Sequence, residues 1–342
     1  MQVSIIIVNW NGRHLMQKCL PSVMESDAIG FNVIIVDNAS TDRSVDWLKE
    51  TYPSVEIVEN AENLGYAGGN NAAIRRSFSE FVLLLNSDVE VARGWLEPLV
   101  QRIQSDPRIA AVVPKIMQYE DRHAFEYAGA AGGFIDDYGV PFARGRIFRT
   151  VERDRGQYEE PADVFWGSGA ALLLRRSALD EVGLLDERFF MHMEEIDLCW
   201  RLRRAGYRIV YEPGSRVFHI GGASLDGSHP RKVYYNVRNS LLMVYKNGAC
   251  PQWARRLSVR IALDSAAAIR FIVTGHPRTA AAIARAHRDA HRMSKHYKDS
   301  CPLTDEAPLP YRGSIAFDYH VRRKRRFGDL DVSRFRPGYD GG

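Results

Sequence analysis

Along the first third of the chain, apolar segments alternate with mixed polar segments, and each segment has the length of a strand or a helix. Continuous apolar runs, which are typical of strands buried on both faces of a sheet, occur at residues 3–8, 32–36, 55–58, 81–85 and 109–113. Stretches with helical character lie between them at residues 13–25, 43–52, 72–79 and 95–105. Strands that alternate with helices predict an α/β fold built on a doubly wound, mostly parallel sheet.

The middle of the chain is less regular. Residues 118–161 are rich in glycine and charge without a clear period, which predicts long loops and short hairpins around the rim of a site. Further strands are expected at 170–174 and 208–211, and a helix is expected at 197–205, ending before Gly206. These elements would complete the sheet.

A change in composition marks the C-terminal part. From Pro251 onward alanine, arginine and histidine dominate, and Pro277 is expected to open a second helix at a position that proline tolerates. The first helix places apolar side chains largely on one face, at Trp253, Leu257, Ile261, Ala268 and Ile272. We therefore expect a main domain at 1–247 and a basic helical extension with a tail at 248–342.

Composition places the chain among ordinary globular proteins, with 342 residues, 45% of them hydrophobic and 26% charged. The four cysteines are widely spaced and form no CxxC pair, which favours a reducing compartment over a disulfide framework or a zinc site. No basic leader precedes the strand at Val3, and no apolar run approaches the roughly 20 residues that span a bilayer. The expected location is cytoplasmic, with a peripheral position on the inner face of the cell membrane.

Positive charge is concentrated near the C-terminus, although the net charge of the chain is only +4. Residues 251–298 hold ten Lys or Arg against Asp264 and Asp289, and a second basic run spans 322–326. Few aromatic residues are available there for base stacking, so we expect an anionic membrane surface as a partner and no nucleic acid. The alternative is that the apolar stripe packs on the main domain and the charges face water.

One apolar strand ends abruptly in the polar residues Asn86, Ser87 and Asp88. The carboxyl ends of strands in an open α/β sheet form the edge where ligands bind. A carboxylate there suits a divalent cation that bridges to a phosphate, because Mg²⁺ takes one or two carboxylates and fills its other positions with phosphate and water oxygens. A turn or a helix cap is the alternative.

Other strand ends carry polar residues as well. Residues 9–12 (NWNG) contain neither GxGxxG nor a P-loop, so a nucleotide would not bind as it does in dehydrogenases or NTPases. Asp37 ends the second strand and could accept a hydrogen bond from a base or ribose, or cap the next helix. Residues 63–71 form a Gly/Asn-rich loop before a helix, which suits the approach of an anion or is a surface turn.

Acidic, aromatic and basic candidates follow in the second half. Glu194, Glu195 and Asp197 would raise one another's pKa, as a general base requires, or they would simply complement a helix start. Trp166 could stack on a sugar or belong to the core. Arg238 could bind a phosphate or be a surface charge.

Taken in order, these motifs resemble glycosyltransferase family 2, the inverting type with a GT-A fold. The matching segments in the first half are VSIIIVNWNG at 3–12, VIIVDNASTD at 33–42, NLGYAGGNN at 63–71 and LLLNSDVE at 83–90. Those in the second half are FWGSGAALLLRRSAL at 165–179, GLLDERFFMHMEEIDLCWRLRRAGYRIVYEPGSRVFHIGGAS at 183–224 and YYNVRNSLLMVYKN at 234–247. The nearest subgroup is the rhamnosyltransferase-like enzymes of bacterial surface-polysaccharide assembly.

The resemblance implies roles for individual residues. The metal-binding DxD position falls on residues 86–88, where Asn86 replaces the first acid and leaves Asp88 as the main acidic ligand, with His219 as an imidazole ligand. A lone histidine is otherwise usually structural. The nucleotide-sugar would be held by strand-end and loop residues, namely Asn9, Asn11, Asp37, Asn38, Asn63, Gly65, Gly68, Asn70, Asn86, Ser87 and Asp88.

On the acceptor side, the resemblance places the family's carboxylate pair on Glu194 and Glu195, with Glu195 as the catalytic base. Relatives often carry Asp at this position, so Glu lengthens the reach by one methylene. Asp197 is the third acid of the catalytic group. The acceptor would contact Trp166, Gly167, Ser168 and Arg238.

The resemblance therefore implies an inverting glycosyltransferase that depends on Mg²⁺ or Mn²⁺. It would move a sugar, such as rhamnose, from a dTDP- or UDP-linked donor to a glycan or polyprenyl-diphosphate-linked acceptor in cell-surface polysaccharide synthesis. Two other classes stay open. A nucleotidyltransferase would need a Gly-rich, Arg/Lys-containing signature after the first strand, which residues 9–12 lack. A non-catalytic protein would bind a nucleotide-sugar or a membrane surface.

Overall fold

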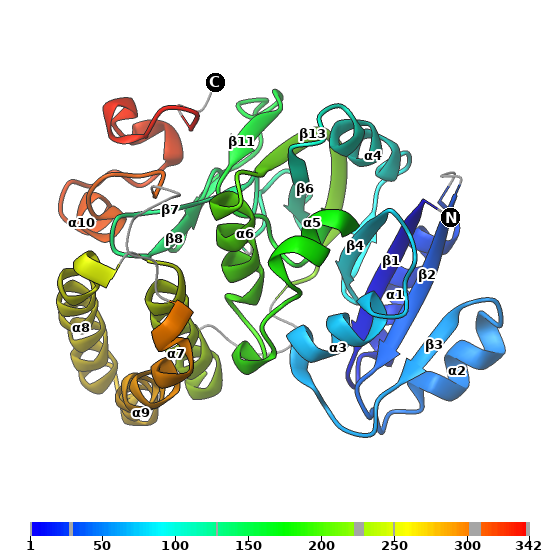
Figure 1. The fold of residues 1–342 in the computed structure, drawn as a ribbon, viewed down its shortest axis with the longest axis horizontal. Coiled ribbons are helices and arrows are strands. Elements are labelled where there is room, and N and C mark those ends of the chain that lie inside the picture. Colours follow the sequence, from blue (N-terminus) through cyan, green and yellow to red (C-terminus); the bar gives the residue numbers. More distant parts are fainter. Residues whose placement is uncertain are drawn as a thin grey trace.

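The centre of the molecule is a nine-stranded sheet (Figure 1). The computed structural model describes residues 2–26, 30–127, 129–221, 229–248, 250–300 and 309–339, without the side chains of 250–254 and 298–300. The strands lie in the order β11-β13-β6-β12-β4-β1-β2-β3, and β5 pairs with β13. Their bounds are β1 (Val3–Asn9), β2 (Phe31–Asp37), β3 (Glu56–Glu59), β4 (Phe81–Asn86), β5 (Val89–Val91), β6 (Ile109–Gln118), β11 (Ala162–Val164), β12 (Ala171–Arg175) and β13 (Arg208–His219).

The half of the sheet nearest the N-terminus is parallel, because β4, β1, β2 and β3 all run in one direction. In the other half β12, β11 and β5 each pair antiparallel with a neighbour. Neighbouring side chains divide between the two faces, so that Ile6 and Ile34 join one core cluster while Ile5 and Ile35 join the other. The predicted α/β sheet is confirmed.

Helices cover both faces of the sheet. Side chains of α1, α2 and α4 share one core cluster with it, and side chains of α3, α5 and α6 share the other. The bounds are α1 (Arg13–Met24), α2 (Ser44–Thr51), α3 (Gly65–Ile74), α4 (Leu96–Gln104), α5 (Arg176–Val182) and α6 (Glu194–Arg204). A short 3₁₀ turn, η1 (Glu187–Phe189), precedes α6.

The irregular stretch after β6 contains a small antiparallel sheet, as its predicted hairpins require. Its strands lie in the order β10-β9-β8-β7, with the bounds β7 (Gly133–Ile135), β8 (Pro141–Ala143), β9 (Arg146–Ile147) and β10 (Thr150–Val151). The end of the chain returns to cover this sheet, because the rings of Phe327 and Phe335 contact Phe134 at centroid distances of 5.1 and 5.6 Å.

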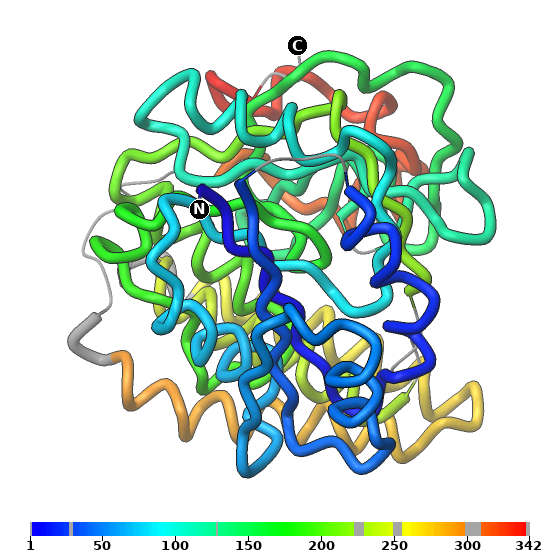
Figure 2. Tube along the Cα trace, turned by 90° about the vertical axis from the view of Figure 1, so that its right-hand side faces the viewer, coloured from blue at the N-terminus to red at the C-terminus, as the bar shows by residue number. Residues whose placement is uncertain are grey.

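Three long helices form a layer at the end of the molecule opposite β1–β3; in Figure 2 the blue strands lie in front of these yellow and orange helices. They are α7 (Pro230–Asn247), α8 (Cys250–Val273) and α9 (Pro277–Ser294), followed by η2 (Lys295–Ser300), α10 (Ile315–His320), η3 (Phe327–Asp329) and η4 (Val332–Arg334). Helix α9 packs along α7 and α8. Within the described ranges, no helix is both long and apolar enough to cross a bilayer.

Some predicted boundaries are wrong. The Gly/Asn-rich segment 63–71 is mostly helix instead of the predicted loop, because α3 begins at Gly65. Helix α3 ends at Ile74, whereas the predicted helix ends at residue 79. At Gly69 a Cβ would lie 2.8 Å from Val8 Cγ1, so packing against β1 supplies the stability that glycine-rich helices lack. Strands β6 and β13 run well past their predicted ends because they pair with each other along their length.

Candidate active site

The carboxyl ends of β1, β2 and β4 meet at one edge of the sheet, where Asn9 lies in register with Asp37. The buried Asn9 amide donates to Asp37 Oδ1 at 2.9 Å and to Ser44 Oγ at 2.9 Å, and its Oδ1 accepts from the Gly12 N–H at 3.0 Å. Asp37 Oδ2 accepts from the Ser40 N–H at 2.9 Å. Asn9 is therefore a scaffold for this edge, and it holds the Asp37 carboxylate in a fixed orientation.

Asn11 and Asn38 flank this pair. Asn11 is half-buried, has a φ of 52°, and accepts from the Thr41 N–H at 2.7 Å. Asn38 is buried; it accepts from Asn60 Nδ2 at 2.8 Å and donates to the Gly65 carbonyl at 2.9 Å. Asn38 thus connects the strand edge to the start of α3.

The start of α3 already has protein acceptors. Asn63 Oδ1 accepts from the Gly65 N–H at 2.8 Å, and the Phe190 carbonyl accepts from the Tyr66 N–H at 2.7 Å. Asn70 donates to the Tyr66 carbonyl at 2.9 Å. These hydrogen bonds do not support an anion bound directly at this helix start, because its first N–H groups bond to the chain itself.

The glycines of this segment serve packing. Gly65 has a φ of +71°, and a Cβ there would overlap the side chain and carbonyl of Phe190. Gly68 lies in the first turn of α3 against Leu64 Cβ. The segment therefore links the carboxyl edge of the sheet to the loop that precedes α6.

His219 and Asp88 meet because β13 pairs with β5, which places His219 opposite Val89. His219 Nε2 lies 3.1 Å from Asp88 Oδ1 and 3.4 Å from the Asn86 amide nitrogen, and its Nδ1 lies 3.3 Å from Glu126 Oε2. Glu126 comes from the irregular stretch after β6, where no motif marks it. Like the partners that usually orient metal-binding histidines, it fixes the imidazole from the far side.

Both members of this pair have perturbed pKa values. Burial alone would raise the pKa of Asp88, but the hydrogen bond and charge of His219 outweigh it and hold that pKa below its usual value. Burial alone would lower the pKa of His219, but hydrogen bonds to Asp88 and Glu126 outweigh it and raise that pKa to about 10. Asp88 is therefore ionised at neutral pH.

These residues fit a divalent cation only in part. One carboxylate, one imidazole and the half-buried Asn86 converge, and Glu126 is on the opposite ring nitrogen. No cluster of three His, Cys, Asp or Glu able to hold a metal occurs in the described part of the chain. A cation here would need oxygens from a ligand and from water, which is the usual arrangement for Mg²⁺ on a diphosphate. The half-buried Ser87 lies between the two strand-end residues.

Glu194 and Glu195 begin α6 and face Tyr66 of α3, whose pKa they raise together with burial. The Oε2 atom of each glutamate is buried and has no hydrogen-bond partner among the residues that the structure describes. Burial raises the pKa of Glu195 to about 7; burial and the charge of Glu195 raise the pKa of Glu194 well above its usual value. Burial, followed by Lys232, lowers the pKa of the nearby His192 to about 4, so that it is neutral. A carboxylate in this state can accept a proton near neutral pH.

The loop before this pair is strained. Phe190, His192 and Met193 have φ values of 67°, 69° and 73°, a region that side chains other than glycine rarely adopt. Asn239 of α7 is fully buried and donates to the carbonyls of Phe189, Met191 and His192 at 2.9, 2.8 and 2.7 Å.

Arg238, which precedes Asn239, reaches the same loop by donating to the carbonyls of Arg188 and Phe189. It is buried, so the expected contact of its guanidinium with an acceptor phosphate is not supported by its placement. Residues 238 and 239 together clamp the loop at 188–192 to α7, a role that the RN pair in YYNVRN did not reveal from the sequence alone.

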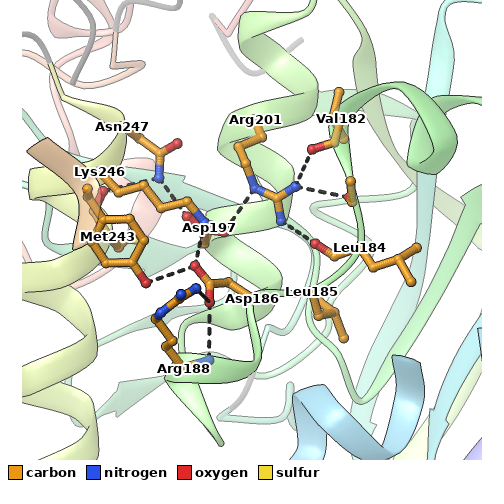
Figure 3. A network of polar contacts seen from close by, with 12 residues as sticks. Val182, Leu184, Leu185, Asp186, Arg188, Asp197, Arg201, Met243, Lys246 and Asn247 are labelled. Carbon is orange, nitrogen blue, oxygen red and sulfur yellow. Dashed lines mark hydrogen bonds and ion pairs between the residues drawn. The ribbon is translucent and has the colours of Figure 1, made fainter. Parts of the chain in front are cut away.

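Asp197 lies in a network of polar contacts with Arg201, Lys246 and Asn247 (Figure 3). It is fully buried and accepts from Arg201 Nε at 3.0 Å, Lys246 Nζ at 2.9 Å and Asn247 Nδ2 at 2.8 Å. Lys246 also donates to Asp186 at 2.9 Å. The structure therefore places this third predicted catalytic acid in a network that joins α6 to α7.

Trp166, Gly167 and Ser168 are buried as well. The Trp166 Nε1 donates to the Phe134 carbonyl at 2.8 Å, and a Cβ on Gly167 would overlap Val113. The expected sugar platform is not supported by the placement of Trp166, because its ring is buried in the core. The neighbouring Gly169 carbonyl accepts from the Tyr66 hydroxyl at 2.6 Å, which ties this segment to the glutamate pair.

Comparison with known proteins gives consistent results. The family model described as glycosyl transferase family 2 matches residues 4–183. An N-acetylglucosaminyl-diphospho-decaprenol L-rhamnosyltransferase of Mycobacterium tuberculosis is 30% identical over 233 residues, which covers 63% of this chain and 75% of the relative. The rhamnosyltransferase WbbL of Escherichia coli is 25% identical over 224 residues, with 64% and 83% covered.

Among solved structures, the mannosyltransferase PcManGT of Pyrobaculum calidifontis, in complex with GDP-Man and Mn²⁺, has the same fold. It superposes with a TM-score of 0.53 at 20% sequence identity, and the match covers 86% of this chain and 79% of that chain. Because the family model spans more than half of the sequence and the sheet has the GT-A arrangement, the chain belongs to glycosyltransferase family 2.

Proposed function

We propose that this glycosyltransferase transfers a sugar, with inversion, from a dTDP- or UDP-linked donor to a glycan or polyprenyl-diphosphate-linked acceptor in cell-surface polysaccharide synthesis. Rhamnose is the favoured sugar, because two of the relatives are named rhamnosyltransferases and one acts on a diphospho-decaprenol acceptor by its name. The observation that carries the proposal is the glutamate pair at the start of α6, whose buried Oε2 atoms have no hydrogen-bond partner among the described residues and suit proton abstraction.

The reaction is a single displacement. An acceptor hydroxyl attacks the anomeric carbon, its proton passes to Glu195, and the bond from that carbon to the diphosphate oxygen breaks. The nucleoside diphosphate leaves with that electron pair. The strained loop held by Asn239 fixes Glu195 relative to α3, so that its carboxylate is oriented before the acceptor binds.

Asp88 and His219 would hold Mg²⁺ or Mn²⁺ against the donor. A cation bound there would offset the charge that develops on the leaving diphosphate. The proposed dependence on metal is supported by the convergence of a carboxylate, an imidazole and an amide at one strand end.

The test is a donor panel. Purified protein is incubated with dTDP-rhamnose, UDP-glucose, UDP-N-acetylglucosamine or GDP-mannose, each with and without Mn²⁺, and with N-acetylglucosaminyl-diphospho-polyprenol as acceptor. Metal-dependent product from dTDP-rhamnose supports the full proposal. Product from another donor would mean that the transferred sugar is not rhamnose, while the proposed glycosyl transfer would stand. Nucleotide-sugar binding without transfer or hydrolysis under any condition would favour the non-catalytic alternative.

A further inference from the structure

Helix α8 is packed the opposite way from an ordinary surface helix. Its inner face carries Arg256 and Arg260, both buried; Arg256 Nε donates to the Asp137 carbonyl at 3.1 Å. Its outer face exposes Ile261 (45%), Ile269 (62%), Ile272 (58%) and Val273 (80%). A surface helix normally buries its apolar stripe and exposes its charges, so this outer face needs a partner.

The apolar stripe expected on this helix is only partly covered by the rest of the protein. Leu257 and Ala268 are half-buried, whereas Ile261 and Ile272 are exposed. The side chain of Trp253 lies outside the described residues. Packing on the rest of the protein therefore accounts for only part of the stripe, and neither of the two predicted alternatives holds in its simple form.

The charge around the exposed apolar residues is positive. Arg255 and Arg270 are exposed on α8, and His276 and Arg278 are exposed where the chain turns into α9. Asp264, the only acid in the sequence of α8, is turned inward and accepts from His287 Nε2 of α9 at 2.9 Å. The outer face thus combines isoleucine side chains with cations and no acid of its own helix.

A second segment extends this surface. Helix α10 exposes Phe317, and Val321 directly after it is exposed as well. The basic run 322–326 that follows is exposed along its whole length. The pKa of His320 is lowered mainly by burial and secondly by the charge of Arg270. His320, at the end of α10, therefore lies within electrostatic range of α8. Figure 1 shows α10 beside α8 at the same edge of the molecule.

We propose that this outer surface, made of the exposed residues of α8, Phe317, Val321 and the run 322–326, docks on an anionic lipid bilayer. Isoleucine and valine would enter the interfacial region while arginine and lysine contact lipid phosphates. A second copy of the chain fits less well, because a two-fold dimer through this face would bring the same cations together. The helix lies on the bilayer and does not span it.

Docking would also orient the enzyme. Helix α7, which clamps the catalytic loop through Asn239, packs against both α8 and α9. The active-site loop is therefore attached to the layer of helices that meets the lipid. This orientation would favour a lipid-linked acceptor, a consequence that rests on the proposed function, whereas the docking itself does not.

The test measures binding of the whole chain to vesicles by co-sedimentation. Vesicles of phosphatidylcholine with phosphatidylglycerol should bind the protein, and vesicles of phosphatidylcholine alone should not. The double variant Ile272→Asp/Val273→Asp should weaken binding about tenfold or more, because it places two anions against the anionic surface. Arg323→Glu/Arg325→Glu should weaken it and reduce its dependence on salt.

Phe78→Asp is the matched control, because Phe78 is 98% exposed between α3 and β4, away from this surface. It should bind vesicles like the wild type. All of these positions are exposed, so circular dichroism should show unchanged folding. Equal binding by the Ile272/Val273 variant, or equal binding to neutral vesicles, would overturn the proposal. So would a wild-type dimer in sedimentation velocity that Ile272→Asp/Val273→Asp converts to a monomer.

Discussion

The first turn of α6 carries two kinds of carboxylate that differ in their surroundings. Glu194 and Glu195 face α3, where their Oε2 atoms have no partner among the described residues. Asp197 lies only two residues further on and faces α7, where three side chains donate to it. The same helix therefore holds acids suited to proton transfer on one side and an acid suited to structure on the other.

The difference shows that neighbours, and not position in a motif, decide what a buried acid does. Burial raises the pKa of Glu195 towards neutrality, although backbone hydrogen bonds oppose this shift. Asp197 accepts hydrogen bonds from a lysine and two further donors, and these contacts hold α6 against α7. Asp88 is intermediate: His219 keeps it ionised, yet it is half-buried at an edge where a ligand can reach it.

Replacement of Glu195 tests the proton-accepting side and should have the largest effect. Glu195→Gln keeps the shape but cannot take the proton, so kcat should fall by about a hundred- to ten-thousandfold. The KM for the donor should change little, because the lost interaction belongs to the transition state. Steady-state kinetics of Glu195→Gln and of the matched variant Glu194→Gln shows which of the two glutamates accepts the proton. An inactive Glu194→Gln beside an active Glu195→Gln would reverse the assignment.

Replacement of Asp88 tests the charged acid at the strand edge. Asp88→Asn removes one anionic ligand and should lower kcat/KM by about a hundredfold, since metal stabilisation supplies several kcal/mol. Binding of Mn²⁺ in the presence of a nucleoside diphosphate, followed by calorimetry, should weaken in parallel. Near-normal turnover at limiting Mn²⁺ would show that Asp88 is not a metal ligand.

Replacement of Lys246 tests the structural side of α6. Lys246→Met leaves Asp186 and Asp197 without their shared cation, so the free energy of unfolding should fall by about 3 kcal/mol. Lys49→Met is the control, because its pair with Glu59 is exposed and should contribute almost nothing. Urea unfolding measures both. Equal stability of the two variants would mean that the network in Figure 3 is not a stabilising element.

Replacement of Asn239 tests how the two sides are joined. Asn239→Ala removes three hydrogen bonds from the strained loop, which should relax and misplace Glu195, lowering kcat about tenfold. Asn236→Ala on the same helix is the control, since the Asn236 side chain donates to the Lys232 carbonyl of its own helix and not to the strained loop. A change in donor KM without a change in kcat would argue against a positioning role.

The dependence on pH tests the shifted pKa of Glu195 without changing a residue. Because burial raises the pKa of Glu195 from 4.5 to about 7, kcat should fall about tenfold for each pH unit below that value. Stability should change in the opposite sense. Between pH 4.5 and about 7, Glu195 keeps a proton in the native state that it loses in the unfolded state. The free energy of unfolding therefore decreases as pH rises through this range. Glu195→Gln should flatten this slope in urea unfolding across the same range.

The sequence by itself determined the sheet and the family. Apolar runs such as 81–85 are local signals of buried strands, and a polar break after such a run places Asp88 at the carboxyl edge of the sheet. The order of the motifs gave the family, which the comparison confirms. These inferences succeed because burial on both faces and motif order are written in the local pattern of residues.

Only the tertiary structure decided which polar and aromatic residues serve the site and which serve the fold. The helical state of residues 65–71, the core position of Trp166 and the inward turn of Arg256 depend on partners far away in the chain. Glu126 has no local signal, because its role comes from the pairing of β13 that brings His219 to it. A residue type predicts what a side chain can do, but long-range packing decides which groups it meets.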